Sequence, residues 1–267
     1  MKPFLKWAGG KRWLARDLTE HFEGFTGTYV EPFLGSGAIF FHFQPDSAIL
    51  SDMNLELITT YSAIRDSHQL VREKLQAHAI MHCEEYYYGV RSERPSQPHE
   101  IAARLLYLNR TCWNGLYRVN KKGQFNVPIG TKDTVVDPNE SFLEISRALS
   151  KAKIRHSDFE ETIELAQEGD LIFADPPYTV AHNNNGFVKY NETIFSWDDQ
   201  VRLAEALQRA SMRGCRVIST NAAHDDLKAL YQDNFNVNEI ARHTVISGQN
   251  KGRKVTAELF VTNVSKV

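Results

Sequence analysis

The sequence has few cysteines, no long apolar run and no excess of positive charge. Its three cysteines, in a chain of 267 residues, are scattered and form no Cys-x-x-Cys pair. This argues against a disulfide framework or a zinc–thiolate site and fits a reducing compartment. No apolar stretch reaches the length of a signal-peptide core or a membrane span, so the sequence predicts a soluble, cytoplasmic protein with no membrane partner.

Several short motifs of known enzyme classes are also missing. The chain has no P-loop and no Gly-x-Ser-x-Gly elbow. His78 and His82 have the spacing of two metal ligands on a helix, but no third ligand accompanies them. The sequence therefore predicts no metal site.

A formal net charge of −2 gives the chain no overall basic character, yet its basic residues are unevenly distributed. Residues 101–132 hold six lysines and arginines and no acid, and residues 241–257 are again basic without an acid. Two such segments can line one groove for a polyanion. Solvated surface charge is the alternative for either segment alone. The six basic residues are Arg104, Arg110, Arg118, Lys121, Lys122 and Lys132.

Short apolar segments with strand character alternate with segments of helical period. Strands are expected at 28–33, 47–52, 153–156, 171–175, 216–220, 235–241 and 256–262. Helices are expected at 12–22 and 36–43, a helical block at 55–112, and a hairpin at 116–127. Another helix is expected to begin after Ser196, where Asp199 completes a capping box, and to end at Gly214. This order predicts an α/β domain with a mostly helical insertion.

The tetrapeptide Asp175-Pro176-Pro177-Tyr178 directly follows an apolar run at 171–174. It is therefore expected where a buried strand ends and its loop begins. Two prolines fix φ and remove two N–H donors, which leaves a stiff bend with outward carbonyls. A carboxylate and proline carbonyls, all acceptors, beside a flat aromatic ring suit the exocyclic amine of a planar base. A rigid strand-to-loop turn is the alternative for the tetrapeptide alone.

A second motif leads from a predicted strand through Gly35-Ser36-Gly37 into a predicted helix. Glycines at such a turn let the backbone approach a ligand closely. Asp52, at the end of the next strand, is placed to accept hydrogen bonds from ribose hydroxyls. Together they suit an adenosine-containing cofactor at the carboxyl edge of a parallel sheet. Phe40 replaces the third glycine of the dinucleotide fingerprint, and a tight strand-to-helix turn is the alternative.

Near the N-terminus, Lys11 and Arg12 follow Gly9-Gly10 at the start of a predicted helix. Cations there oppose the helix macrodipole at a cost of about 0.3–1 kcal/mol each. A nearby ligand carboxylate or phosphate would offset this cost. A surface pair whose charge is screened by salt is the alternative.

Taken in order, these motifs resemble those of the Dam-like, D12-class DNA adenine-N6 methyltransferases. The resemblance covers nearly the whole chain, from Trp-Ala-Gly-Gly-Lys at Trp7 and Glu-Pro-Phe-x-Gly-x-Gly at Glu31 to Asp-Pro-Pro-Tyr at Asp175. It extends into segments 114–120 and 125–130, which are similar to the family's DNA-reading hairpin. Each motif is moderately specific, and their ordered combination is highly specific.

The resemblance implies a Rossmann-like S-adenosylmethionine-dependent methyltransferase domain at 1–56 and 146–267. A mostly helical DNA-recognition domain containing a β-hairpin would be inserted at 57–145. The implied reaction moves a methyl group from S-adenosylmethionine to N6 of a flipped-out adenine in double-stranded DNA, with GATC as the first expectation for the recognition sequence. No metal and no obligate protein partner are implied, and a monomer would suffice.

The resemblance also implies roles for individual residues. The matching cofactor-binding positions are Trp7, Lys11, Gly35, Gly37, Asp52, Phe159 and Asp175. The matching catalytic positions are Asp175, Pro176 and Tyr178. The matching DNA-binding positions are Asn114, Leu116, Arg118 and Pro128, with Lys121 and Lys122 as phosphate contacts. For Phe159 a purely structural buried ring is the alternative, and for Arg118 a phosphate contact is the alternative to a bidentate contact with guanine.

Two other classes of function stay open at this point. One is an enzyme of the same fold that acts on another amine, such as cytosine N4, adenine in RNA or a protein side-chain amide. The other is a catalytically silent DNA-binding regulator. A regulator would be expected to carry a broken Asp-Pro-Pro-Tyr or Gly-x-Gly motif, and both are intact here.

Overall fold

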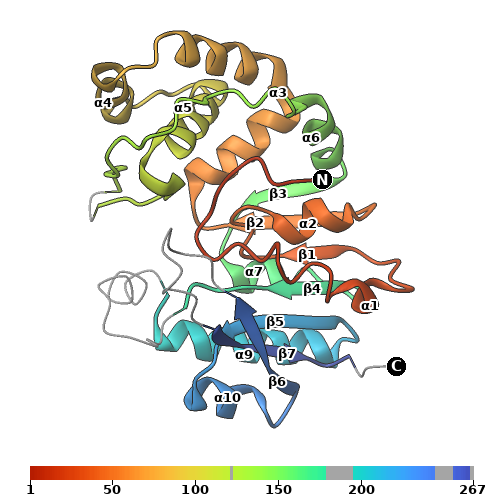
Figure 1. The fold of residues 1–267 in the computed structure, drawn as a ribbon. Helices are drawn as coiled ribbons and strands as arrows, with labels where there is room; N and C mark the ends of the chain where they lie inside the picture. Colours follow the sequence, from red (N-terminus) through yellow and green to blue (C-terminus); the bar gives the residue numbers. More distant parts are fainter. Residues whose placement is uncertain (121–122, 179–194, 244–254, 265–267) are drawn as a thin grey trace. The chain divides into compact units, whose positions relative to one another are not determined.

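The computed structural model describes residues 1–120, 123–178, 195–243 and 255–264 (Figure 1). The chain forms two compact units. The first contains Met1–Asp17 and Leu34–Ser157, and the second contains Leu18–Phe33 and Asp158–Val267. The functional division expected from the sequence, a catalytic domain with an inserted DNA-recognition domain at 57–145, stays a prediction.

The first unit holds a parallel pair of strands and a short helix. Strand β2 (Ala48–Asp52) pairs with β3 (Ala152–His156) along its whole length, from Ala48 opposite Ala152 to Asp52 opposite His156. Helix α2 (Ala38–Phe43) begins at once after Gly37, whose left-handed backbone turns the chain into the helix. Its first four residues, Ala38 to Phe41, are buried, so this helix belongs to the core of the unit.

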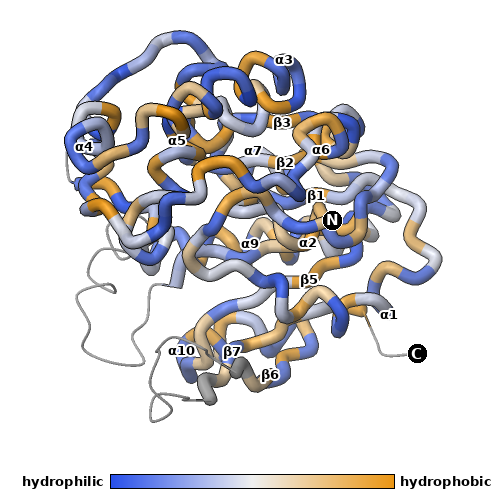
Figure 2. The backbone as a smooth tube through the Cα atoms, turned by 45° about the horizontal axis from the view of Figure 1, so that its top comes forward, coloured by the Kyte–Doolittle hydropathy of each residue, from blue (hydrophilic) through white to orange (hydrophobic). Residues whose placement is uncertain are grey.

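A block of helices follows β2 in the first unit, as the periodicity at 55–112 predicts. Its members are α3 (Leu55–Ile80), α4 (Glu84–Ser92) and α5 (Pro98–Thr111), and α6 (Phe142–Leu149) precedes β3. The buried tyrosines Tyr61, Tyr87 and Tyr107 fill much of this core. In Figure 2, hydrophobic residues recur along these helices with hydrophilic residues between them, which is the pattern of helices buried along one face.

After α5 the chain makes a short 3-10 turn, η1 (Trp113–Gly115), and then pairs with itself. Two antiparallel bridges join Cys112 to Ile129 and Val119 to Phe125. Asn126 N–H also donates to the carbonyl of Arg118 at 3.1 Å. The hairpin predicted at 116–127 is therefore present as an irregular antiparallel ribbon. Lys121 and Lys122 lie outside the described residues.

In the second unit, β1 (Tyr29–Glu31), β4 (Leu171–Ala174) and β5 (Arg216–Ala222) run parallel, and β7 (Val255–Thr262) is antiparallel to both β5 and β6 (Asn236–His243). All four residues of β4 are buried, as expected for an interior strand of a parallel sheet. The helices of this unit are α1 (Thr19–Phe22), α7 (Phe159–Ile163), α9 (Trp197–Met212) and α10 (Asp225–Tyr231). The capping box predicted at Ser196 and Asp199 is confirmed at the start of α9.

One predicted helix is wrong. Residues 12–22 form consecutive turns, and only Thr19–Phe22 is α-helical. The bonds from Leu14 N–H to Lys11 and from Asp17 N–H to Leu14 are i to i−3 bonds of turns. Leu14, Ala15 and Leu18 are nevertheless buried. The apolar spacing thus predicted correctly which side chains are buried, but it did not determine the backbone bonding.

Among the described residues of the second unit, the strands follow the order β1-β4-β5-β7-β6. Strands and helices alternate along the chain, so the mixed α/β, Rossmann-like fold class predicted from the sequence is confirmed. None of the described helices combines the length and the apolar composition that a bilayer crossing requires.

Candidate active site

The glycine-containing loop before α2 is shaped by two left-handed glycines. Gly35 has φ +47° and Gly37 has φ +61°, a region in which side-chain-bearing residues are strained. A Cβ atom on Gly35 would stand 2.9 Å from Cδ1 of Trp7, and one on Gly37 would stand 3.2 Å from the hydroxyl of Tyr61. The indole of Trp7 therefore lies directly against the backbone of this loop.

Asp52 ends β2 and is fixed by backbone donors. Its Oδ2 accepts the Gly35 N–H at 3.0 Å, and its Oδ1 accepts the Asn54 N–H at 2.9 Å. Burial raises the pKa of Asp52 above its usual value, while the two N–H donors oppose that rise. A carboxylate offers about four acceptor positions, so each oxygen keeps capacity for a ligand hydroxyl. This donor and acceptor arrangement fits a ribose.

The remaining predicted cofactor residue of the first unit, Lys11, lies next to a glycine that contacts the same loop. Gly10 approaches Ser36, since a Cβ on Gly10 would stand 3.4 Å from the Ser36 hydroxyl oxygen. Lys11 follows it, is 3% exposed and donates from Nζ to the carbonyl of Gly9 at 3.2 Å. The structure thus brings Trp7, the glycine loop and Asp52 into direct contact, with Lys11 next to Gly10.

Two tyrosines also belong to this cluster, although sequence reasoning did not assign them to the site. The hydroxyl of Tyr61 donates to the carbonyl of Gly35 at 3.0 Å, and this hydrogen bond helps to fix the backbone of the loop. The ring of Tyr117 stacks on Trp7, with ring centroids 4.8 Å apart and an interplanar angle of 22°. Neither contact is encoded locally, because each joins residues that are far apart in the sequence.

In the second unit, Asp175 follows β4, as its position after the apolar run predicted. The hydroxyl of Thr220 donates to Asp175 Oδ1 at 2.8 Å. The register explains this contact, because Ala174 pairs with Ser219 and the next residues along both strands are therefore neighbours. Pro176 is buried, and Tyr178 is half-buried. Sequence reasoning missed Thr220 because its partner lies 45 residues earlier in the chain.

Phe159, predicted to pack on the cofactor's adenine, is 4% exposed and belongs to an aromatic cluster. Its ring stacks on Phe33 at 5.4 Å and contacts Phe195 at 5.5 Å. The guanidinium of Arg202 lies 4.8 Å from the ring centroid and binds Asp158 at 2.8 Å. Phe159 is thus well fixed, and its contact with a cofactor stays a prediction.

The predicted DNA-reading residues of the first unit are exposed on the ribbon after α5. Asn114 has φ +56°, a left-handed conformation that asparagine tolerates. Leu116 is 40% exposed, Arg118 is exposed and donates from Nε to Asn126 Oδ1 at 2.9 Å, and Pro128 is exposed. These side chains are accessible to a large ligand. Their contacts with DNA stay predictions.

The interpretation of residues 101–132 as one basic surface is wrong for two of its members. Arg104 is 4% exposed and pairs with Glu56 at 2.7 Å. Arg110 forms two hydrogen bonds with the carboxylate of Glu140, at 2.9 and 2.8 Å. Both arginines stabilise the helical block, since a buried guanidinium needs an acid and carbonyl partners. Most of the second basic segment, including Lys251, Arg253 and Lys254, lies outside the described residues.

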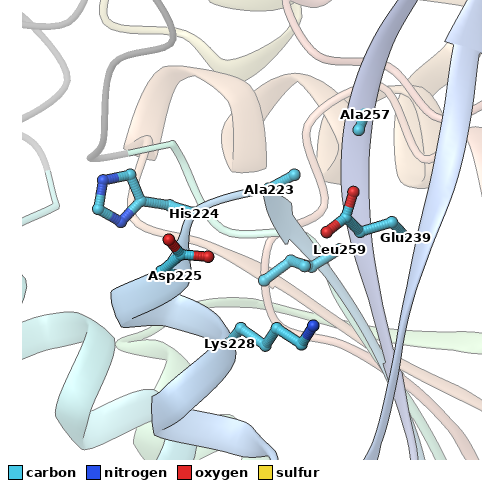
Figure 3. Close-up of a pocket in the computed structure, with 7 residues that line it drawn as sticks. All are labelled: Ala223, His224, Asp225, Lys228, Glu239, Ala257 and Leu259. Atoms are coloured by element: carbon cyan, nitrogen blue, oxygen red, sulfur yellow. The ribbon is translucent and has the colours of Figure 1, made fainter.

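The second unit also has a pocket of ≈ 290 Å³ beside α10 (Figure 3). Lys228 from α10 and Glu239 from β6 place opposite charges around it. Its remaining lining residues are Ala223, His224, Asp225, Ala257 and Leu259. None of the predicted cofactor, catalytic or DNA-binding residues lines this pocket.

A parallel sheet with a glycine-containing loop after one strand and an acid at the end of the next is typical of α/β proteins that bind nucleotide-like ligands. The chain belongs to a narrower group within this class. The model of the D12 class N6 adenine-specific DNA methyltransferase family matches residues 7–246. The protein is a member of that family, and so of the DNA adenine methyltransferases.

Comparison with individual proteins agrees with this assignment. The chain is 35% identical to the Type II methyltransferase M1.LlaDCHI of Lactococcus lactis subsp. cremoris, over 98% of this chain and 95% of that protein. It is 32% identical to the Type II methyltransferase M.MjaIII of Methanocaldococcus jannaschii, over 95% and 96% of the two chains. It is 30% identical to a DNA adenine methylase of Vibrio cholerae, over 97% and 95%.

Proposed function

We propose that the protein is a site-specific enzyme that transfers a methyl group from S-adenosylmethionine to N6 of adenine in double-stranded DNA. The observation that carries this proposal is the Asp175-Pro176-Pro177-Tyr178 corner at the end of buried strand β4, with its carboxylate held by Thr220. Family membership supports a DNA adenine substrate.

The residues around the glycine loop are proposed to hold the cofactor. Asp52 accepts hydrogen bonds from the ribose hydroxyls, the loop at Gly35 and Gly37 allows close approach of the backbone, and Trp7 provides an apolar wall. Lys11 is proposed to pair with the carboxylate of the cofactor, and Phe159 is proposed to pack against its adenine. S-adenosylmethionine, when bound, supplies an electrophilic methyl group on a sulfonium centre, so the proposal requires no metal.

The catalytic corner acts on the amine. The lone pair of an adenine N6 is delocalised into the ring, which makes the amine a weak nucleophile. The Asp175 carboxylate and the Pro176 carbonyl are proposed to accept the two N6 hydrogens, favouring a more pyramidal nitrogen with a localised lone pair. Tyr178 is proposed to stack on the base. Flipping the base out of the duplex costs a few kcal/mol, which such contacts offset.

The ribbon after α5 is proposed to read the DNA sequence. Arg118 would contact a guanine edge and contribute about 1–3 kcal/mol of discrimination against other bases. Asn114, Leu116 and Pro128 would contact neighbouring positions, and Lys121 and Lys122 the phosphates. The similarity of this segment to the family's DNA-reading hairpin makes GATC the proposed recognition sequence.

The test is an assay with purified full-length protein and three synthetic duplexes. One contains a GATC site, one contains the same site already methylated on both adenines, and one is scrambled. Mass spectrometry of DNA digested before and after the reaction should show an increase in N6-methyladenine in the first duplex only. N4-methylcytosine as the product, or methylation of an RNA substrate in preference to DNA, would contradict the proposed target.

Asp175→Ala tests the assigned catalytic role. The substitution removes the acceptor at the reacting amine, and kcat should fall at least about 100-fold, the scale of losing one preorganised hydrogen-bonding group in an active site. Retained binding of S-adenosylhomocysteine to this variant would show that the fold survives. Methylation near the parent rate would overturn the role assigned to Asp175.

A further inference from the structure

The segment 116–118 presents its side chains alternately to solvent and to the protein. Leu116 and Arg118 are exposed, whereas Tyr117 between them is half-buried. This alternation is that of an extended chain, in which neighbouring side chains point to opposite faces. Two of the proposed DNA-reading side chains therefore occupy one face and Tyr117 lies on the other, while Asn114 is exposed in the preceding 3-10 turn.

On the inner face, Tyr117 contacts the proposed cofactor site through Trp7. The two rings stack with centroids 4.8 Å apart and planes 22° from parallel. Trp7 also lies against the glycine loop, with its Cδ1 2.9 Å from the position that a Cβ on Gly35 would take. The same Gly35 donates its N–H to Asp52. Tyr117, Trp7 and Gly35 thus form one continuous chain of contacts.

The Tyr117 side chain is also fixed by a hydrogen bond from its hydroxyl group to the helical block. Its hydroxyl donates to Glu56 Oε2 at 2.9 Å, and the other oxygen of Glu56 accepts from Arg104 at 2.7 Å. Arg104 is itself fixed by the carbonyls of Val90 and Arg91. Burial, and after it the charge of Glu56, raises the pKa of Tyr117, so the phenol stays protonated and donates. The ring therefore has a fixed position relative to the helical block.

We propose that Tyr117 is a positioning residue that sets the Trp7 indole for cofactor binding from within the DNA-reading segment. The proposal rests on the proposed function of Trp7 and of the ribbon. Because one segment contacts DNA on one face and the cofactor wall on the other, ordering it for one ligand reduces the cost of binding the second. Such coupling must be reciprocal between the two ligands.

The test measures binding of S-adenosylhomocysteine by calorimetry to the full-length protein, first without DNA. Tyr117→Leu should weaken binding about 3- to 10-fold, the scale of one aromatic pair. Tyr117→Phe keeps the ring and should restore affinity to within about twofold of the parent, on the same scale. Tyr88→Leu is a control for loss of a tyrosine elsewhere in the unit.

The second measurement repeats the titration with a saturating duplex that contains the recognition sequence. DNA should increase the affinity of the parent protein and of Tyr117→Phe for S-adenosylhomocysteine by at least about 5-fold, which is the lower end of usual coupling. Tyr117→Leu should lose most of this enhancement. Thermal unfolding of each variant separates a lost fold from a lost contact, and the enhancement in the parent protein tests the proposal even if Tyr117→Leu does not fold.

The possible outcomes are distinct. If the parent protein binds no S-adenosylhomocysteine, or Trp7→Ala leaves that binding intact, the proposed cofactor site is wrong. If the parent binds normally but shows no enhancement by DNA, or Tyr117→Leu keeps both the affinity and the enhancement, the cofactor site stands and the positioning role of Tyr117 is wrong.

Discussion

Two aspartates at the ends of buried strands are held in different ways. Asp52 follows β2 and receives one backbone N–H on each oxygen, from Gly35 and Asn54. Asp175 follows β4 and receives a side-chain hydroxyl, from Thr220. Backbone donors persist through most substitutions, whereas a hydroxyl disappears with a single one. The comparison teaches that Asp52, the proposed ribose-binding acid, is held by the backbone, whereas Asp175, the acid proposed to act at the amine, accepts a hydrogen bond that depends on the side chain at position 220.

The largest effect is expected where a substitution disturbs the backbone that holds Asp52. Gly35→Ala combines a left-handed φ of +47° with a contact of 2.9 Å to Trp7. Backbone strain of this kind costs about 1–3 kcal/mol, so binding of S-adenosylhomocysteine should weaken by up to about 100-fold. Calorimetric titration measures the change.

Gly24→Ala is the matched control for that variant. Gly24 also has a positive φ, +65°, but a Cβ there would meet nothing within 4 Å. It should lower the free energy of unfolding by about 1–2 kcal/mol through backbone strain alone and leave cofactor affinity unchanged. If Gly35→Ala bound S-adenosylhomocysteine as tightly as the parent protein, the close packing of Trp7 against the loop would not be required for cofactor binding.

A smaller effect, confined to the reaction step, is expected at the other acid. Thr220→Val keeps the shape of the side chain and removes the hydroxyl that donates to Asp175 at 2.8 Å. A hydrogen bond to a charged group contributes at least about 1.5 kcal/mol, so kcat should fall about 10-fold or more. KM for the cofactor should stay constant, because Asp52 and the glycine loop are untouched.

Two variants control that experiment. Thr220→Ser retains the hydroxyl and should recover most of the rate. Ser219→Ala removes the neighbouring hydroxyl, which is buried and has no hydrogen-bond partner among the described residues, and should leave kcat unchanged. A Thr220→Val enzyme that lost cofactor affinity and rate together would indicate a general packing role instead.

The smallest effect on cofactor affinity is expected at Asn54, because this residue binds Asp52 through its backbone N–H and not through its side chain. Asn54 caps α3, where its Oδ1 accepts the Leu57 N–H at 3.0 Å, and its own N–H binds Asp52. Asn54→Ala should lower the free energy of unfolding by about 1 kcal/mol through the lost cap. Cofactor affinity should change by less than about 2-fold, since that amide remains and side-chain changes away from the ligand have small effects. A tenfold loss of cofactor affinity would contradict the conclusion that Asp52 is held by backbone donors alone.

Local patterns in the sequence predicted much of the fold. The strands β2, β4 and β5 were located to within two residues because each is a short apolar run bounded by turn-forming or polar residues. The capping box at Ser196 was found because its bonds join residues three positions apart. The helix expected at 12–22 failed because burial periodicity was taken for backbone bonding.

The partners of the site residues could not be predicted in the same way. Thr220 meets Asp175 only because β4 and β5 pair in one register, and a shift by one residue would turn Thr220 to the opposite face. Arg104 looked like a candidate for a basic surface, but the packing of α3 and α5 buries it against Glu56. Long-range pairs of this kind leave no signature in one sequence.

By itself, the sequence predicted which residues carry the chemistry: the glycines at 35 and 37, the aspartates at 52 and 175, and the proline-stiffened corner. Each depends on a local property, such as a permitted φ, a missing N–H or a position directly after an apolar run. Only the tertiary structure decided what holds those residues in place, namely Thr220 at Asp175 and Tyr117 at Trp7. The physical reason is that a hydrogen bond or a ring stack depends on distance in space, which strand register and helix packing set.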